Sequence, residues 1–460
     1  MQAKPYPRYR PSGVGWLGDV PVHWEVKRGR FCMDVNPRSN RLWTLEPEAE
    51  VSFIPMDAVG EYGGLDLEQV RAISEVDSGY TEFDDGDVVV AKITPCFENG
   101  KGALAVGLVN GAAFGTTELH VLRATTALDR RILFYFTLSW PFRSTGEGEM
   151  YGAGGQKRVP PEFCKNVRVP LPPPDEQCMI AHFLDRETAK IDALVTKKRT
   201  LVERLKEKRT ALISRTVTKG LPPDAARAAG LNPYPKLKPS GIDWLGDVPE
   251  HWNTWKATHG FRRIGSGTTP KSDDADYYDG DIPWVTTSEL RESVIMDTAT
   301  KVTAAAIRDY PTLRLYPKAT LLFAMYGATI GRLGILGIPA TVNQACAAFA
   351  DPLYLDTQFV YYWFQMRRPT LIALSAGGGQ PNLSQDDLRQ VRIPAPPLGE
   401  QRVIADFLDH ETAKIDQMAA KVEATIDRLQ EYRTAIITAA MTGKIDVRTR
   451  AARPTIPNRV

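Results

Sequence analysis

Two stretches of this chain place hydrophobic residues at alternating spacings of four and three, over residues 170–219 and 394–444. The first begins PLPPPDEQCMIAHFLDRETAKID and the second PAPPLGEQRVIADFLDHETAKID, so the pattern is an internal repeat with an offset of 224 residues. A sustained 3.5-residue repeat forms a narrow apolar stripe of the kind that coiled coils bury. We therefore predict two long helices that pair with each other, antiparallel if a pseudo-twofold relates the two copies.

The predicted seam is the apolar stripe that each helix turns toward the other. Its positions follow one ladder of alternating four- and three-residue steps along each copy. They are Ile180, Leu184, Ile191, Leu194, Leu201, Leu205 and Leu212 in the first copy, and Ile404, Leu408, Ile415, Met418, Val422, Leu429, Tyr432 and Ile436 in the second.

A second repeat opens each half of the chain as a proline-punctuated arm. YPRYRPSGVGWLGDVPVHW begins at Tyr6, and YPKLKPSGIDWLGDVPEHW begins at Tyr234. A tryptophan pair beside a histidine has two interpretations, a base-stacking or catalytic site and a packing anchor. We favour packing, because tryptophan is a large apolar side chain that most often anchors a core. The equivalent residues are Trp16, His23 and Trp24 in the first arm and Trp244, His251 and Trp252 in the second.

Between each arm and helix lies a segment whose pattern predicts strands followed by a helix. In the first half the expected strands cover residues 51–55, 87–93 and 102–109, with a helix over 128–140. In the second half they cover 282–286, 320–325 and 333–338, with a helix over 355–366. A glycine-rich loop and a final strand, VRVPLP or VRIPAP, follow in each half.

The predicted fold class is therefore α/β (α+β), with two domains separated by two long helices that form an antiparallel coiled coil in a pseudo-twofold internal repeat. The predicted boundaries are 1–169 for the first arm and domain, 170–219 for the central helix, 220–240 for a linker, 241–393 for the second domain, 394–444 for the second helix and 445–460 for a tail.

Composition places few limits on function. The formal net charge of +2 does not by itself indicate nucleic acid. The five cysteines form no CxxC pair and the six histidines are scattered, so we expect no structural metal site. The N-terminus has no apolar run of the secretory type, and a reduced cytoplasmic setting is expected.

Motifs for catalysis are missing from the sequence. It contains no GxxxxGK[ST] phosphate loop and no [DNS]PP[YF] methyltransferase motif. The glycine loops at 152–155 and 377–379 are not placed between a strand and a helix, as a dinucleotide site would require. Hairpin turns and DNA-approaching loops remain equally open interpretations of these glycines.

The doubled EQ-x-x-IA-x-FLD-x-ET-x-KID signature, with GSGTTP at residues 265–270 and the two GGQ loops, resembles the DNA-specificity subunit of type I restriction-modification systems. The resemblance covers nearly the whole chain, although the first domain lacks the GSGTTP opening. It implies two target-recognition domains that each read half of a bipartite DNA site.

The resemblance also implies partners. Two methyltransferase subunits and the restriction subunits would assemble on this chain and bind S-adenosylmethionine, ATP and Mg, whereas this chain would be non-catalytic and carry no cofactor. The alternative from the residues alone is a coiled-coil scaffold that joins two protein-binding domains without DNA.

Candidate DNA contacts are polar side chains near the glycine loops, because Asn and Gln match the edge of adenine and Arg or Lys that of guanine. They are Lys92, Gln156, Lys157 and Arg158 in the first domain, and Lys271, Arg332, Asn343, Gln380 and Asn382 in the second.

A basic run lies in the first long helix. Residues 197–219 contain nine Lys or Arg against two Glu. A solvated helix face is the ordinary interpretation, and a stripe that faces DNA phosphates is the alternative.

Overall fold

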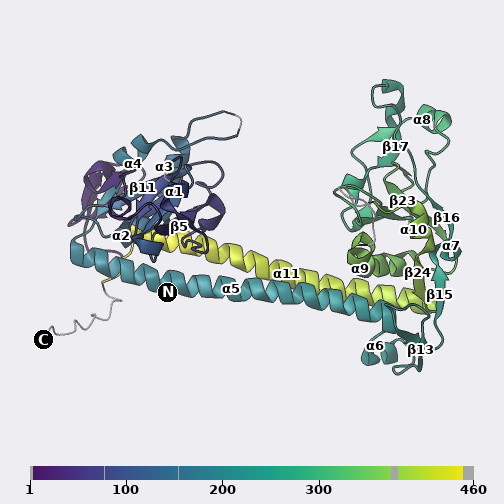
Figure 1. The fold of residues 1–460 in the computed structure, drawn as a ribbon. Coiled ribbons are helices and arrows are strands. Elements are labelled where there is room, and N and C mark those ends of the chain that lie inside the picture. The colour runs from purple at the N-terminus through teal and green to yellow at the C-terminus, as the bar shows by residue number, and fades with distance from the viewer. Residues whose placement is uncertain (1–3, 77, 154, 374–381, 449–460) are drawn as a thin grey trace. The chain divides into compact units, whose positions relative to one another are not determined.

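The computed structural model describes residues 4–448 except 77, 154 and 374–381 (Figure 1). Two compact units divide the chain. Unit 1 comprises Met1–Arg199 and Glu423–Val460, and unit 2 comprises Thr200–Val422. Each unit holds one arm, one mixed α/β domain and parts of both long helices, so the predicted fold class is confirmed.

Unit 1 contains two four-stranded sheets. The first is antiparallel with the order β4-β11-β8-β9, and the second has the order β6-β5-β10-β7 with β5 and β10 parallel. The strands are β4 (Met33–Val35), β5 (Glu50–Ile54), β6 (Val70–Ala72), β7 (Thr81–Asp84), β8 (Val88–Ala91), β9 (Gly102–Leu104), β10 (Ala112–Gly115) and β11 (Leu119–Ala124). The helices are α1 (Ile73–Val76), α2 (Arg130–Leu138), α3 (Trp140–Gly148) and α4 (Pro161–Asn166).

Unit 2 repeats this plan. Its larger sheet has the order β16-β23-β20-β21-β18, and its smaller sheet has the order β19-β17-β22 with β17 and β22 parallel. The strands are β16 (Phe261–Gly265), β17 (Tyr278–Val285), β18 (Ser293–Ile295), β19 (Lys301–Val302), β20 (Leu321–Ala324), β21 (Leu333–Leu336), β22 (Thr341–Val342) and β23 (Cys346–Pro352). The helices are α6 (Pro223–Ala228), α7 (Ala257–Gly260), α8 (Ala304–Asp309), α9 (Thr357–Ala373) and α10 (Gln385–Gln390).

The six expected strands and two expected domain helices are present, as β5, β8, β9, β17, β20, β21, α2 and α9. The central strands β11 and β23 were not predicted. In β23, five consecutive residues from Cys346 to Ala350 are buried, so the strand has no polar alternation to reveal it.

Each arm docks on its own domain by strand pairing. In unit 1, β3 (Glu25–Arg28) pairs with β12 (Arg168–Leu171), the predicted final strand. In unit 2, β15 (Asn253–Lys256) pairs with β24 (Arg392–Ala395) in the same way. The remaining arm strands form two-stranded ribbons, β1 (Tyr9–Pro11) with β2 (Asp19–Pro21), and β13 (Leu237–Pro239) with β14 (Asp247–Pro249).

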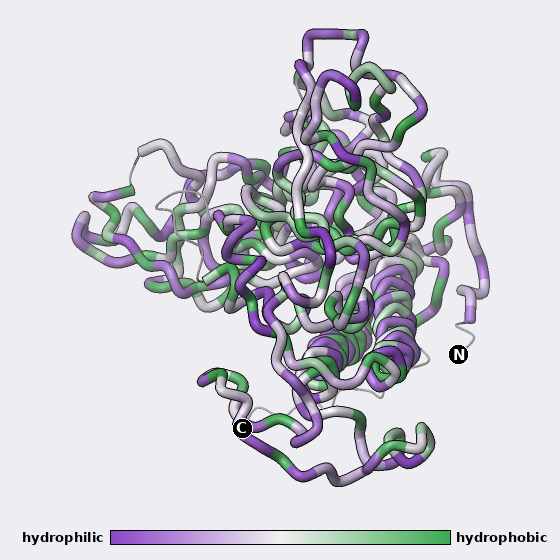
Figure 2. The backbone as a smooth tube through the Cα atoms, turned by 90° about the vertical axis from the view of Figure 1, so that its right-hand side faces the viewer, coloured by the Kyte–Doolittle hydropathy of each residue, from purple (hydrophilic) through white to green (hydrophobic). Residues whose placement is uncertain are grey.

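The long helices are α5 (Pro174–Lys219) and α11 (Leu398–Met441). Within unit 1 the start of α5, at Ile180 and Leu184, packs into one core with the end of α11, at Ile437 and Met441. Within unit 2 the end of α5, at Ile213, shares a core with the start of α11. The helices therefore run antiparallel inside each unit. In Figure 2 their coils alternate between hydrophilic and hydrophobic colours, as amphipathic helices do.

The buried stripe of these helices follows an 11-residue repeat rather than a heptad. Buried positions that recur at this interval are Ile180, Ile191, Val202 and Ile213 in α5, and Ile404, Ile415, Ile426 and Ile437 in α11. Eleven residues make three turns of about 3.67 residues, close to the α-helical 3.6, so the stripe stays on one face.

The heptad ladder is wrong in the middle of both helices. Leu201 is 43% exposed and Leu194 is 48% exposed, whereas their neighbours Val202 and Val195 are buried. In the second helix Met418 and Tyr432 are likewise exposed. The other predicted seam residues are buried or partly exposed. Those buried are Ile180, Leu184, Ile191, Ile404, Leu408, Ile415 and Ile436, and those partly exposed are Leu205, Leu212, Val422 and Leu429.

Among the described residues, no helix combines the length and apolar character that crossing a bilayer requires.

Candidate nucleic-acid interface

The glutamate of each EQ signature fastens an arm to a long helix. Glu176 is 4% exposed and accepts hydrogen bonds from three arm side chains, at 2.5 Å from the Tyr6 hydroxyl, 2.7 Å from His23 Nε2 and 3.1 Å from Trp24 Nε1. Glu400 accepts the equivalent bonds from His251 and Trp252, at 2.8 and 3.0 Å.

Trp24 and Trp252 are at most 1% exposed, so neither indole offers a face on which a base can stack. The packing interpretation of these tryptophans therefore agrees with their burial and with their bonds to the two glutamates. The arm tryptophans Trp16 and Trp244 are less buried.

The glutamine of each signature fastens the domain to the same helix. Gln177 Oε1 accepts from Asp129 N at 2.7 Å, while its amide donates to the carbonyls of Ala127 and Pro172. Gln401 makes the same three bonds, with Asp356 N, Tyr354 O and Pro396 O.

A tyrosine from each domain helix completes the attachment. The Tyr135 hydroxyl in α2 donates to Asp185 Oδ1 at 2.7 Å and lies 3.3 Å from Thr188 Oγ1. Tyr362 in α9 makes the same contacts with Asp409 and Thr412. The EQ, FLD and ET parts of the signature therefore have structural roles.

Equivalent ion pairs link the long helices in each unit. In unit 1, Arg433 of α11 bonds to Asp192 of α5 at 3.0 Å. In unit 2 the arginine comes from α5 and the aspartate from α11, and Arg209 bonds to Asp416 at 3.0 Å. Both pairs involve repeat-equivalent positions, which supports the internal symmetry predicted from the sequence.

In unit 1 the structure brings the four candidate DNA residues together. The backbone of Val159 donates to the carbonyl of Lys92 at 2.8 Å, and Thr94 N donates to the carbonyl of Lys157 at 3.0 Å. The turn that carries Gln156 is closed by two backbone bonds between Tyr151 and Arg158, so the glycine loop is a hairpin turn. Gln156 and Lys157 are exposed at its tip.

Arg158 is engaged within the domain. Its guanidinium binds both carboxylate oxygens of Glu118, with the shortest distance 2.7 Å, and holds the pKa of Glu118 below its usual range. His120 lies next to this pair and is 3% exposed, and burial lowers its pKa. The neutral imidazole then donates a hydrogen bond from its Nε2–H to the carbonyl oxygen of Val159, 2.8 Å away.

In unit 2 the candidates divide into two groups. Asn382 forms a backbone bridge with Tyr326, near the turn that carries exposed Arg332. Asn343 caps a turn through its bond from Ala345 N at 3.2 Å. Lys271 directly follows the separate GSGTTP segment and is exposed. Gln380 lies outside the described residues.

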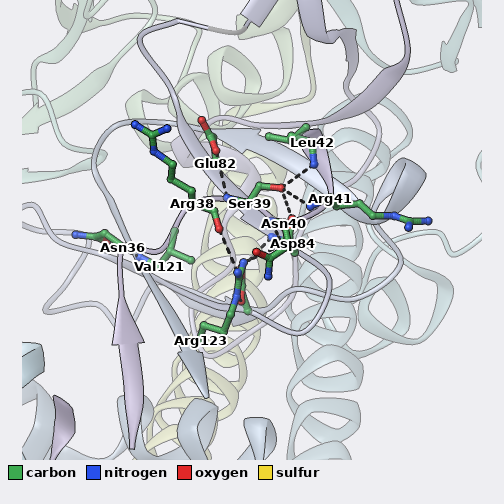
Figure 3. Close-up of polar contacts among 11 residues, drawn as sticks. Asn36, Arg38, Ser39, Asn40, Arg41, Leu42, Glu82, Asp84, Val121 and Arg123 are labelled. Atoms are coloured by element: carbon green, nitrogen blue, oxygen red, sulfur yellow. Dashed lines mark hydrogen bonds and ion pairs between the residues drawn. The ribbon is translucent and has the colours of Figure 1, made fainter. Parts of the chain in front are cut away.

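Sequence reasoning did not single out the loop Asn36–Trp43, which follows β4. Its polar contacts are drawn in Figure 3. The only sequence signal is a short run, NPRSNRLW, with two arginines and no acid. In this domain that run is offset by a surplus of acidic residues elsewhere.

The described residues contain no group of three or more His, Cys, Asp or Glu that could hold a metal ion. Most of the basic residues between 197 and 219 are exposed, and Lys206 and Arg209 also pair with carboxylates.

Residues 249–428 match the family model described as type I restriction modification DNA specificity domain. The "Type I restriction enzyme EcoAI specificity subunit" of Escherichia coli is 40% identical over 161 residues, which cover 35% of this chain and 27% of that protein. The "Putative type I restriction enzyme MjaX specificity subunit" of Methanocaldococcus jannaschii is 21% identical over 443 residues, 94% of this chain and 96% of that protein.

A solved structure titled "Structural basis underlying complex assembly and conformational transition of the type I R-M system" has a chain that is 19% identical, with a TM-score of 0.68. It covers 93% of this chain and 99% of that one, and it shows a shared fold. The matched segment spans about a quarter of the first curated relatives, 27% in each case. The relatives that these matches name are specificity subunits of type I restriction enzymes. Over residues 249–428 the chain is similar to the type I DNA specificity domain, and over nearly its whole length it is similar to a putative type I specificity subunit.

Proposed function

We propose that this chain is the non-catalytic DNA-reading subunit of a type I restriction-modification complex and that its two domains each recognise one half of a bipartite, asymmetric site. The observation that carries the proposal is the repeated frame. The two domains share the core strand orders, β4-β11-β8-β9 with β16-β23-β20-β21 and β6-β5-β10 with β19-β17-β22. They also share the attachment through Glu, Gln and Tyr, yet the segments at their loop edges differ in sequence. Two domains with similar frameworks and different loops are suited to recognise two different half-sites.

Chemistry in the complex would belong to partners. S-adenosylmethionine would bind the methyltransferase subunits, and ATP and Mg would bind the restriction subunits. The DNA substrate and the five unpaired thiols suit the cytoplasm.

We assign the methyltransferase contact in unit 1 to a groove along the end of α11. The groove has a volume of about 790 Å³, and its apolar wall includes Trp16 and Trp140, the latter 60% exposed. Its floor has small side chains, including Ala435, Ala439 and Thr438, which let a partner helix approach closely. Asp427 and Glu431 line it too, so an amphipathic helix with basic residues is the fitting occupant.

Selection from random duplex DNA tests the main proposal. The chain co-purified with its methyltransferase subunits is incubated with a random library, and the retained DNA is sequenced. We expect a two-part asymmetric motif with a constant unread gap. An intact, folded complex that enriches no sequence would instead support a protein scaffold.

The groove is tested by Ala435→Arg, which places a long cation in its floor. We expect much less methyltransferase to co-purify with this variant. The control is Ala424→Arg, on an exposed part of the same helix that does not line the groove. Equal loss from both variants would contradict the assignment.

A further inference from the structure

The loop Asn36–Trp43 alternates between anchored and presented side chains. Ser39 and Leu42 are buried at 1% and 9% exposure, whereas Arg38, Asn40 and Arg41 are exposed. Trp43 is 70% exposed, and Arg38 lies over its ring at 5.8 Å. The loop therefore turns two cations, one amide and one aromatic ring toward solvent.

Acidic groups beneath the loop hold it in place (Figure 3). Asp84 accepts from the Ser39 hydroxyl and, at 2.8 Å, from Asn40 N, while Ser39 Oγ accepts from Leu42 N at 2.9 Å. Arg123 bonds to Asp84 and Asp87 at 2.9 and 2.6 Å and donates to the carbonyl of Arg38 at 3.1 Å. These contacts hold the loop backbone in place, so ordering the loop on a ligand would cost little conformational entropy.

A buried histidine joins this loop to the other candidate residues of unit 1. Asn36 Nδ2 lies 3.3 Å from His120 Nδ1, and His120 Nε2 donates to Val159 O. Val159 in turn bonds to the backbone of Lys92. Asn36, at the start of the 36–43 loop, is therefore linked through His120 to the segment that carries Val159 and to the end of β8.

Unit 2 has a loop at the equivalent place. Its GSGTTP segment follows β16, the strand equivalent to β4, and is also anchored from within. Trp284 Nε1 donates to Thr268 O at 3.2 Å, and the Thr269 hydroxyl donates to Gln344 Oε1 at 2.6 Å. The first domain therefore has a counterpart of the GSGTTP opening that its sequence does not resemble.

We propose that the 36–43 loop is the base-reading element of unit 1: Asn40 reads a base edge in the groove, and Arg38 and Arg41 contact the flanking phosphates. The proposal rests on the proposed function. Asn presents an acceptor and a donor that match the N6 and N7 edge of adenine, so adenine is the expected base. Arginines at either side fix the register of the loop on the duplex.

Local charge favours this surface within unit 1. Residues 1–165 carry 18 basic and 22 acidic side chains, so the domain as a whole does not attract DNA. The 36–43 loop carries Arg38 and Arg41 and no acidic residue. Arg123 pairs with its supporting carboxylates Asp84 and Asp87 and offsets one of their two negative charges. Among the described residues the side-chain amide of Asn40 makes no hydrogen bond, and the Arg41 guanidinium donates only to the Asn110 carbonyl, at 3.3 Å.

The test uses the complex of this chain with its methyltransferase subunits and compares Asn40→Ala, Arg38→Ala and Arg41→Ala. Arg8→Ala, an exposed arm arginine of the same unit, is the control. Each variant undergoes selection from random duplex DNA, and its binding is titrated against salt. Unfolding curves establish that each variant folds, as expected for exposed positions.

For Asn40→Ala we expect about a 5- to 150-fold loss of discrimination at one base pair of one half-site, with the other half-site unchanged. Each arginine variant should bind all sequences more weakly and lower the log–log salt slope by about 0.9. An unchanged motif with unchanged salt slopes overturns the inference, and so does a relaxed motif in both halves. Failure of the proposed function is distinct, because the parent complex would then select no motif.

Discussion

Glu176 accepts hydrogen bonds from side chains that lie 152 to 170 residues earlier in the sequence. It is buried, and its carboxylate is the common acceptor for the Tyr6 hydroxyl, the His23 imidazole and the Trp24 indole. Both oxygens of a carboxylate accept hydrogen bonds. In a glutamine side chain one of these oxygens is replaced by an NH₂ group, which is itself a donor and cannot accept from the arm side chains. The arm is therefore attached by a group that no neutral isostere replaces.

Glu176→Gln should lower the free energy of unfolding of unit 1 by about 2–4 kcal/mol, because buried donors lose their acceptor. Denaturant titration followed by tryptophan fluorescence measures it. Asp175→Asn, at the exposed neighbouring position, should change stability by less than about 0.5 kcal/mol. Glu400→Gln, with two donors rather than three, should cost less than Glu176→Gln.

The Glu118–Arg158 pair predicts a pH dependence. Arg158 lowers the pKa of Glu118 in the folded state, so the ionised carboxylate stabilises the fold above its unfolded pKa of about 4.3. That contribution is lost as pH falls through the lower folded-state pKa. Glu118→Gln should flatten this part of a stability profile measured from pH 6 to 2, whereas exposed Glu68→Gln should leave it unchanged.

Sequence reasoning predicted the packing role of Trp24 but not its partner, because nothing local connects residues 24 and 176. It selected Lys92 and Gln156 from residue type and a nearby glycine loop. It missed Arg38 and Asn40, because their exposure depends on a fold in which Ser39 turns inward. Alternation of anchored and presented side chains in a loop follows no periodic pattern.

At the scale of elements, the position and length of α5 and α11 were predictable and their buried face only partly so. A 3.5-residue ladder and an 11-residue repeat share Ile180, Leu184 and Ile191. They then differ by one residue, and this difference separates Leu194 from Val195 and Leu201 from Val202. Because both adjacent positions are hydrophobic, the sequence alone does not distinguish the heptad from the 11-residue repeat.

Substitutions at the adjacent pair distinguish the two repeats. Val202→Ala should cost about 2 kcal/mol, because a buried side chain loses two methyl groups and leaves a cavity. Leu201→Ala removes a larger but exposed side chain and should cost less than about 0.5 kcal/mol. Thermal and denaturant unfolding of both variants measure these costs; the reverse order would restore the heptad.

At the scale of the whole molecule, the repeats in the sequence predicted two similar units, and only the folded chain reveals that their loop edges correspond. If each domain reads one half-site independently, residues 265–388 can be replaced by the equivalent segment of another specificity subunit. Replacing them with the segment from another specificity subunit should change one half-site and leave the other as it was, as read by selection of random DNA. A change in both half-sites would show that the domains do not read independently.

The unread gap should depend on helix length. Inserting 22 residues, two 11-residue repeats, between Ile191 and Val202 and again between Ile415 and Ile426 keeps the buried stripe in register. Each insertion adds about 33 Å of helix, close to the 34 Å of one DNA turn. We expect a gap about 10 base pairs longer with both half-site sequences unchanged. A single 11-residue insertion in each helix adds a length equal to about half a turn of DNA. The resulting variant should bind the sites with the longer gap poorly.

The repeated attachment has a consequence for the gene as well as for the protein. The DNA that encodes the two EQ signatures is a pair of similar stretches 224 codons apart, since Glu400 follows Glu176 by that distance. Recombination between them excises one domain and leaves a shorter chain with one hybrid helix. That product keeps a glutamate, a glutamine and a tyrosine for its remaining domain, but it has lost the antiparallel partner of its helix. Two such products, joined through their hybrid helices, would restore that pairing with identical domains, and the expected target is then a palindrome.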